Sequence, residues 1–364
     1  MTLAGKGIFI WKIRACELGD VNQITNLAQQ AGFSHVLVKV ADGAFSYNVT
    51  ETGDDLVPPL IHSLRSKGIQ VWGWHYIYGD YPRSEADRAI HRINQLSLDG
   101  YVLDVEGEYK QPGKYTAAKL FMSRLRAKYP QLPIALSSYR YPSYHPQVPW
   151  KAFLESCDFN MPQVYWQHAH NPADQLARSV REFQSLTPFR PIIPTGSAYR
   201  TGSWLATPAD VKTFMQTCQA QNLRAFNFWE WSNCRKYLPD VWRAIADYPS
   251  TVAEPPKDIA HAFLDALNSR DPDRVADLYS TSALHITSAR TTHGVISIRK
   301  WYSHLFRHLL PNASFNLTGF TTSPSSRHLT WTAASDRGAV HNGSDTLGIQ
   351  NDKISYHYSF FTVS

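Results

Sequence analysis

The stretch Tyr101-Val-Leu-Asp104-Val-Glu106-Gly-Glu108 joins a short apolar run to closely spaced acids. The run predicts a buried strand, and side chains two residues apart on a strand point to the same face, with Cα atoms roughly 6.5 Å apart. Two shielded carboxyl groups at that spacing cannot both ionise easily, so the pKa of one of them should rise. Such a pair suits acid–base chemistry on glycosidic bonds. The alternative is a strand end whose acids pair with nearby Lys or Arg.

Seven more apolar runs lie on either side of this strand in the first 250 residues, and segments with helical spacing separate them. The eight runs are Gly7–Ile13, His35–Val40, Val71–Ile77, Tyr101–Val105, Ile134–Ser138, Phe159–Tyr165, Pro191–Thr195 and Ala225–Trp231. Strands that alternate with helices form right-handed βαβ units and a parallel sheet. Eight repeats predict an α/β fold with a closed (β/α)8 TIM barrel. No GxGxxG or GxxxxGKS/T motif occurs, so the usual nucleotide sites are not indicated.

A change of pattern divides the chain into a barrel at 1–249, a linker at 250–257 that contains Pro255-Pro256, and a smaller α+β domain at 258–364. Helices are expected first in the smaller domain and strands after them, which is the order of a separate α+β unit. The expected helices are Asp258–Asn268, Asp271–Leu278 and Ile298–Leu310, and the expected strands are Ala313–Phe320, His328–Ala334, Gly338–Ile349 and Lys353–Val363.

Composition narrows the class of partner. The 364 residues carry a formal charge of +6 with no block of Lys or Arg, so no nucleic-acid surface is indicated. Four separated cysteines form no CxxC pair, and neither a disulfide framework nor a zinc site is expected. No apolar run reaches the length of a membrane span, and no signal peptide is recognised at the N-terminus. The compartment stays open, because an export signal could have been removed.

The carboxyl ends of the strands are where a TIM barrel carries its active site, and acids stand there among Trp and Tyr. Aromatic rings stack on the C–H faces of sugars, while amide, hydroxyl and carboxylate groups bind sugar hydroxyls. Each aromatic residue alone is explained as well by core packing, but the ring as a whole indicates a sugar site. No metal spacing and no GxSxG elbow occurs, and no cofactor is expected. The candidate substrate-binding residues are Trp11, Lys39, Asp42, Trp74, His75, Tyr76, Gln163, Tyr165, Trp229 and Trp231.

Four of these strand ends are similar to motifs of the glycoside hydrolase family 25 lysozymes. They are Lys39-Val-Ala-Asp42-Gly43, Trp74-His75-Tyr76, Leu103-Asp104-Val105-Glu106 and Trp229-Glu230-Trp231. The resemblance covers about residues 5–248, and its D-x-E element is the most specific part. It implies hydrolysis of an amino-sugar polysaccharide such as peptidoglycan. Glu106 would donate the proton to the glycosidic oxygen, and Asp104 would stabilise positive charge or orient the acetamido group of the substrate.

The first strand departs from the family pattern, because Phe9 stands where family members carry an acid. Glu230, where the family usually has Gln, is a candidate replacement acid on the opposite side of the barrel mouth. A barrel that binds glycan without cleaving it is therefore the first alternative to a hydrolase.

The smaller domain resembles the nuclear transport factor 2-like (NTF2-like) and SnoaL-like superfamily, on residues 262–271, 275–279 and 294–301. That resemblance implies a cone of helices against a curved sheet, which houses a small ligand, a catalytic dyad or nothing, and often pairs as a homodimer. The candidates for its pocket are His285, Trp301, Tyr356 and Tyr358. A working site in this cone, with the barrel as scaffold, is the second alternative.

Overall fold

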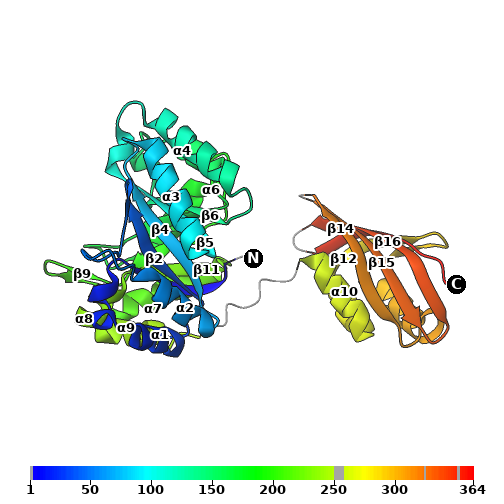
Figure 1. Ribbon diagram of the computed structural model, residues 1–364. Coiled ribbons are helices and arrows are strands. Elements are labelled where there is room, and N and C mark those ends of the chain that lie inside the picture. The colour runs from blue at the N-terminus through cyan, green and yellow to red at the C-terminus, as the bar shows by residue number, and fades with distance from the viewer. Residues whose placement is uncertain (1–2, 250–257, 324, 351–352) are drawn as a thin grey trace. The chain divides into compact units, whose positions relative to one another are not determined.

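The computed structural model describes residues 3–249, 258–323, 325–350 and 353–364. It divides into two compact units, Met1–Ala253 and Glu254–Ser364 (Figure 1). The predicted linker, 250–257, lies outside the described residues.

The first unit contains eight parallel strands that close into a barrel. Its strands are β1 (Gly5–Ile10), β2 (His35–Asp42), β4 (Gln70–Ile77), β5 (Gly100–Val105), β6 (Ile134–Tyr139), β7 (Phe159–Val164), β8 (Thr195–Ser197) and β11 (Ala225–Trp229). Closure is complete because β1 pairs in parallel with both β2 and β11, the second and the last of these strands. The sequence prediction of a closed α/β barrel is confirmed.

Helices separate the strands and cover the outside of the barrel (Figure 1). They are α1 (Val21–Gln30), α2 (Val57–Ser66), α3 (Pro82–Leu96), α4 (Lys114–Lys128), α5 (Trp150–Leu154), α6 (Pro172–Gln184), α7 (Pro208–Ala220), α8 (Trp231–Tyr237) and α9 (Pro239–Ala246). Local sequence explains several helix starts. The Asp20 carboxylate accepts hydrogen bonds from the first turn of α1, and Thr207 forms a capping box with Asp210 at α7.

One predicted strand is displaced. The run Pro191–Thr195 was expected to form the seventh barrel strand, but β8 begins only at Thr195 and a single bridge at Ile192 precedes it. Pro191 and Pro194 have no N–H to donate to a neighbouring strand, so this segment cannot form a continuous ladder. Three short strands of this unit were not predicted: β3 (Phe45–Ser46), β9 (Arg200–Thr201) and β10 (Trp204–Leu205). In the second unit, β12 (Tyr279–Thr287) and β13 (Thr291–His293) were not predicted either, and they precede its last helix, so the expected order of helices first and strands after is wrong there.

The interior of the barrel is a packed apolar cluster that includes Phe9, Leu37, Trp72 and Val102. A larger cluster lies between the strands and the surrounding helices. Lys6 links the first strand to the last helix: its buried ammonium donates to the carbonyls of Ile245, Ala246 and Tyr248 at 2.6, 2.9 and 2.6 Å. Carbonyl groups at a helix C-terminus lack partners within the helix, and a cation there stabilises the helix end.

All four cysteines lie in the barrel unit as buried free thiols: Cys16, Cys157, Cys218 and Cys234. Burial raises the pKa of each thiol, to about 12 for Cys157. They pack as small apolar residues.

The second unit has its own sheet and core. Its helices are α10 (Ile259–Ser269), α11 (Pro272–Ala276) and α12 (Val295–His304), and a π-helical turn, Leu305–Leu309, follows α12. Its six strands are β12 (Tyr279–Thr287), β13 (Thr291–His293), β14 (Ser314–Thr322), β15 (Ser326–Ser335), β16 (Gly338–Gln350) and β17 (Lys353–Phe360). The order across the sheet is β13-β12-β17-β16-β15-β14. The expected helix Ile298–Leu310 is thus an α-helix that begins earlier and changes to π geometry in its last turn.

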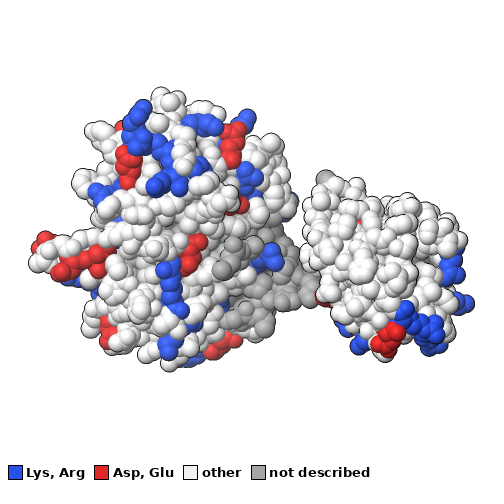
Figure 2. All heavy atoms as spheres, turned by 45° about the vertical axis from the view of Figure 1, so that its right-hand side comes forward, with Lys and Arg blue, Asp and Glu red and all other residues white. Residues whose placement is uncertain are grey.

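The surface carries both signs of charge. On the face of the barrel unit that Figure 2 shows, Lys and Arg lie interspersed with Asp and Glu, while much of the visible face of the second unit carries no charged side chain. No helix in the described parts of the chain is long and apolar enough to cross a membrane.

Candidate functional site

The two acids of the fourth barrel strand, β5, meet at one amide group. The Gln163 side chain at the end of β7 donates from Nε2 to Asp104 Oδ1 at 2.9 Å and to Glu106 Oε1 at 3.0 Å. Asp104 is buried and Glu106 is half-buried. The predicted placement of both carboxylates at one point of the barrel mouth agrees with this geometry.

Asp104 holds a proton more firmly than an ordinary aspartate. Burial is the main cause that raises its pKa well above the usual range, and the neighbouring Glu106 carboxylate raises it further. Lys39 and the hydrogen bond from Gln163 oppose this effect only in part. A carboxyl group that tends to keep its proton therefore stands beside Glu106, and acid catalysis on a glycosidic oxygen requires such a proton source.

Aromatic side chains surround the acid pair. They enclose a cavity of about 210 Å³, lined by Phe9, Trp11, Lys39, Trp74, Tyr76, Asp104, Glu106, Ser137, Gln163, Tyr165 and Trp229. Nine of the thirteen residues predicted from sequence as catalytic or substrate-binding are in this lining. Phe9 forms part of the floor, because its ring contacts Trp74 and Trp229 with centroids 6.0 and 5.5 Å apart.

A second and larger cavity, of about 470 Å³, adjoins the first. Its lining is Glu106, Tyr139, Arg140, Tyr141, Tyr144, His145, Gln163, Tyr165, Gln167, Tyr199 and Trp229. Four residues belong to both cavities: Glu106, Gln163, Tyr165 and Trp229. Glu106 consequently stands at the junction, with space for a ligand on both sides of its carboxylate.

Four predicted site residues do not line either cavity. Asp42 forms an ion pair with Lys39 at 2.6 Å and accepts from the Tyr78 hydroxyl at 2.8 Å. His75 is buried in hydrogen bonds with the Gly43 carbonyl and the Tyr101 hydroxyl. Its role is structural, and burial lowers its pKa to about 4.

The side chains of Trp231 and Glu230 also lie outside both cavities. Trp231 is buried against Trp242, with ring centroids 4.8 Å apart. Glu230 is buried and caps α8, where its carboxylate accepts from the backbone N–H groups of Ser232 and Asn233 at 3.1 and 2.6 Å. The peptide bond between Trp229 and Glu230 is cis. The structure does not bring Glu230 to the acid pair.

The loop after β6 supplies residues that the sequence reading did not assign to the site. Arg140, Tyr141, Tyr144 and His145 all line the larger cavity. The sequence feature that could have indicated these residues is a run rich in aromatic and basic residues at the end of the strand, Tyr139-Arg-Tyr-Pro-Ser-Tyr-His145. Strand ends alone do not reveal such residues, because a loop must fold back over the barrel mouth to place them.

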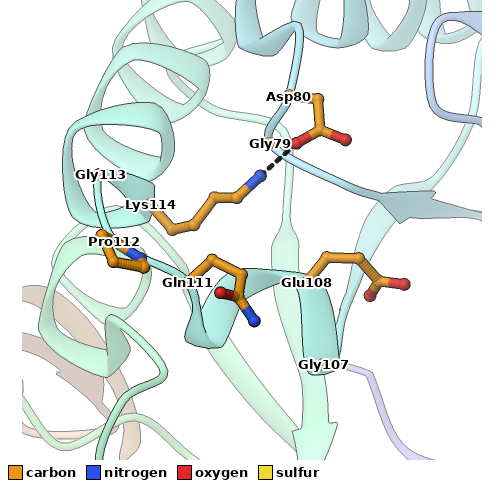
Figure 3. A pocket seen from close by; sticks show the side chains of 8 residues that line it. All are labelled: Gly79, Asp80, Gly107, Glu108, Gln111, Pro112, Gly113 and Lys114. Carbon is orange, nitrogen blue, oxygen red and sulfur yellow. Dashed lines mark hydrogen bonds and ion pairs between the residues drawn. The ribbon is translucent and has the colours of Figure 1, made fainter.

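A separate open cleft is lined in part by Glu108, whose carboxylate accepts from the Tyr76 hydroxyl at 2.8 Å. Figure 3 shows its lining, in which the Lys114 ammonium points to Asp80 while the Glu108 carboxylate points away from this pair. Lys114 is satisfied by Asp80 at 2.5 Å and by the Tyr78 carbonyl at 2.8 Å. The cleft therefore offers no free cation, and the aromatic cavities are the better candidate site.

The predicted pocket of the second unit is not assembled. His285 is buried and stacks on His357, with centroids 4.4 Å apart. Tyr356 and Tyr358 flank His357 on β17 and are 40% and 45% exposed, because neighbouring residues of a strand point to opposite faces. Trp301 lies near His285, at 6.0 Å between centroids. Over the described residues, no group of three or more His, Cys, Asp or Glu side chains is placed to hold a metal ion.

Comparison with known proteins adds little on activity. No family model and no curated protein matches the chain. An NTF2-like protein of unknown function from Cytophaga hutchinsonii ATCC 33406 is matched with a TM-score of 0.25 at 10% identity, over 29% of this chain and 88% of that one. A hypothetical protein with a ketosteroid isomerase-like fold from Catenulispora acidiphila DSM 44928, in complex with trimethylamine, is matched with a TM-score of 0.27 at 15% identity. The match covers 30% of this chain and 88% of that one.

A third structure, an NTF2-like protein of unknown function from Burkholderia xenovorans LB400, gives a TM-score of 0.26 at 16% identity, over 29% of this chain and 81% of that one. The chain thus has partial structural matches of the NTF2-like kind. None of these three structures supports the resemblance to glycoside hydrolase family 25.

Proposed function

We propose that the barrel unit hydrolyses a polysaccharide of N-acetylated amino sugars, such as peptidoglycan. The observation that carries the proposal is the position of Glu106 at the junction of two aromatic cavities, so that a glycan chain can cross its carboxylate. The smaller cavity would take the sugar on one side of the cleaved bond, with its apolar face on Trp74 or Trp229. The larger cavity would take the next sugar.

Glu106 is proposed as the group that protonates the glycosidic oxygen, because it is the half-buried member of the pair and reaches both cavities. Asp104 would hold the proton beforehand, pass it to Glu106 and become ionised as positive charge develops on the sugar. The glycosidic C–O bond then breaks as a nucleophile attacks the anomeric carbon, and the water that afterwards hydrolyses the resulting intermediate returns a proton to the pair. Gln163 keeps both carboxyl groups in place through its single amide nitrogen.

The substrate's own acetamido group is proposed as the nucleophile. The two cavities have no acids in their linings other than Asp104 and Glu106, since Phe9 occupies the first strand end and Glu230 caps α8. Hydrolases without an opposing carboxylate can use the N-acetyl oxygen of the substrate instead. This requirement restricts the substrate to N-acetylated sugars.

Turbidity of a cell-wall suspension and release of reducing ends test the proposal. Wild-type protein should clear the walls, and Glu106→Gln should reduce the rate by at least a hundredfold, because the amide cannot donate the proton. Walls whose amino sugars have been chemically deacetylated should not be cleaved. An active Glu106→Gln variant would remove the assigned acid, and glycan binding without cleavage by the wild type would favour the non-catalytic alternative.

The second unit is proposed as an NTF2-like domain that pairs two copies of the chain. Supporting this, three neighbouring outward positions on β17 carry exposed aromatic side chains, Tyr356, Tyr358 and Phe360, each at least 40% exposed. Exposed apolar patches of this kind mark interaction surfaces. A small-ligand site in this unit finds less support, since two of its four predicted residues face the opposite side of the sheet from His357.

A further inference from the structure

Charge is distributed unevenly along the two cavities. The smaller cavity contains Asp104 and shares Glu106 with the larger one, and its one cation, Lys39, is already paired with Asp42. The larger cavity contains Arg140 and His145, and Lys110 lies 4.2 Å from the centre of the Tyr139 ring that lines it. Moving away from Asp104, a ligand thus passes from an acidic to a basic surface.

Arg140 is the cation in this region that is fixed in place but not neutralised. Its Nη1 donates to the backbone carbonyl of Tyr165, and its guanidinium lies 5.1 Å from the centre of the Tyr141 ring. Within the described ranges it forms no ion pair, whereas Arg178, further along the same groove, is paired with Glu182 at 2.8 Å. The side chain is half-buried and lines the larger cavity.

A guanidinium held in this way has donors left for a planar anion. Of its five N–H groups one is used by the Tyr165 carbonyl and another faces the Tyr141 hydroxyl, which leaves the remaining donors to a ligand in the cavity. Arginine recognises carboxylates through two parallel hydrogen bonds, and these charge-assisted bonds are about twice as strong as neutral ones. A half-buried position strengthens the interaction, because solvent screens it less than it screens a surface pair.

We propose that Arg140 binds a carboxylate carried on a sugar ring of the polysaccharide, in the larger cavity on the far side of Glu106 from Asp104. This assignment rests on the proposed function, because that proposal is what identifies the ligand as a glycan. The cation of the smaller cavity, Lys39, is already paired with Asp42, so only the larger cavity offers this carboxylate a partner, and the chain lies across Glu106 in one direction. The substrate class becomes an acidic amino-sugar polymer rather than a neutral one.

Binding measurements can test this without any turnover. The full chain with Glu106→Gln is titrated calorimetrically with two tetrasaccharides of equal length: the neutral N-acetylglucosamine tetramer, and an alternating N-acetylglucosamine–N-acetylmuramic acid tetramer without stem peptides. The acidic tetramer should bind more tightly. Adding Arg140→Gln should reduce the ratio of the two affinities by about ten- to a hundredfold, as expected for a lost hydrogen-bonded charge pair.

Matched variants and ligands exclude a general structural effect. Arg140→Lys keeps the charge and should restore part of the preference. Arg83→Gln removes an exposed arginine of α3 that lines neither cavity, and it should leave the ratio unchanged. An acidic tetramer whose carboxylates have been amidated should bind like the neutral one.

The proposal is overturned if the acidic tetramer binds no better than the neutral one, or if Arg140→Gln weakens both equally. It is also overturned if a preference appears only with ligands that carry stem peptides, since the carboxylate would then belong to the peptide. Its failure can be told apart from failure of the hydrolase proposal. An Arg140-dependent preference in a wild-type protein that cleaves no wall leaves this assignment intact and removes the hydrolase. A wild-type protein that cleaves walls but shows no preference for the acidic tetramer keeps the hydrolase proposal and removes the Arg140 assignment.

Discussion

At the scale of single residues, the protonation of Asp104 couples the site to stability. Its carboxyl group has a pKa raised by burial and by Glu106, so between the usual aspartate range and this raised value the folded state binds more protons than the unfolded state. Stability must therefore fall as pH rises through that window. Each unit of pKa shift corresponds to about 1.4 kcal/mol.

We expect Asp104→Asn to remove this dependence. The amide oxygen can still accept from Gln163, and no charge has to be buried. Thermal unfolding of both proteins from pH 4 to pH 7 should show the variant gaining stability relative to the wild type as pH rises, with little difference at pH 4. Glu51→Gln, an exposed position, serves as the control and should show no such trend. A constant difference across the range would contradict the buried, protonated Asp104.

At the scale of elements, Glu230 illustrates a residue whose role depends on the helix that follows it. As the cap of α8 it satisfies two N–H groups that the helix cannot satisfy itself. Glu230→Ala should lower the free energy of unfolding by about 1–2 kcal/mol, measured by urea denaturation, whereas Glu230→Gln should lose less because its amide oxygen still accepts. Wall hydrolysis by Glu230→Gln should persist. Loss of hydrolysis with unchanged stability would restore Glu230 as a catalytic acid.

The same scale shows what sequence can and cannot predict. Barrel closure followed from eight apolar runs, and the meeting of Asp104 with Glu106 followed from the two-residue repeat of a strand, which is purely local geometry. Whether Glu230 faces the cavity or the next helix depends on one backbone turn after the strand, which spacing does not encode. Arg140 was missed for a related reason, because its loop folds back over the barrel mouth.

At the scale of the whole molecule, the exposed row on β17 predicts a dimer. Light scattering on the full chain at micromolar concentration should give twice the 41.3 kDa mass of one chain. Tyr358→Lys combined with Phe360→Lys should give the monomer mass, because like charges would face each other across the interface. Tyr81→Lys, at an exposed tyrosine of the barrel unit, should leave the dimer intact. A wild-type monomer, or a doubly substituted dimer, would refute the pairing surface.

The buried thiols of the barrel have a practical consequence. Because the thiolate is the reactive form and each of the four sulfurs is both enclosed and held protonated, the native chain should react with maleimide as slowly as a chain without cysteine. A fluorophore could then be attached to one engineered surface cysteine with no need to remove the natural ones. In urea, the onset of labelling at the natural cysteines would report when the barrel wall opens.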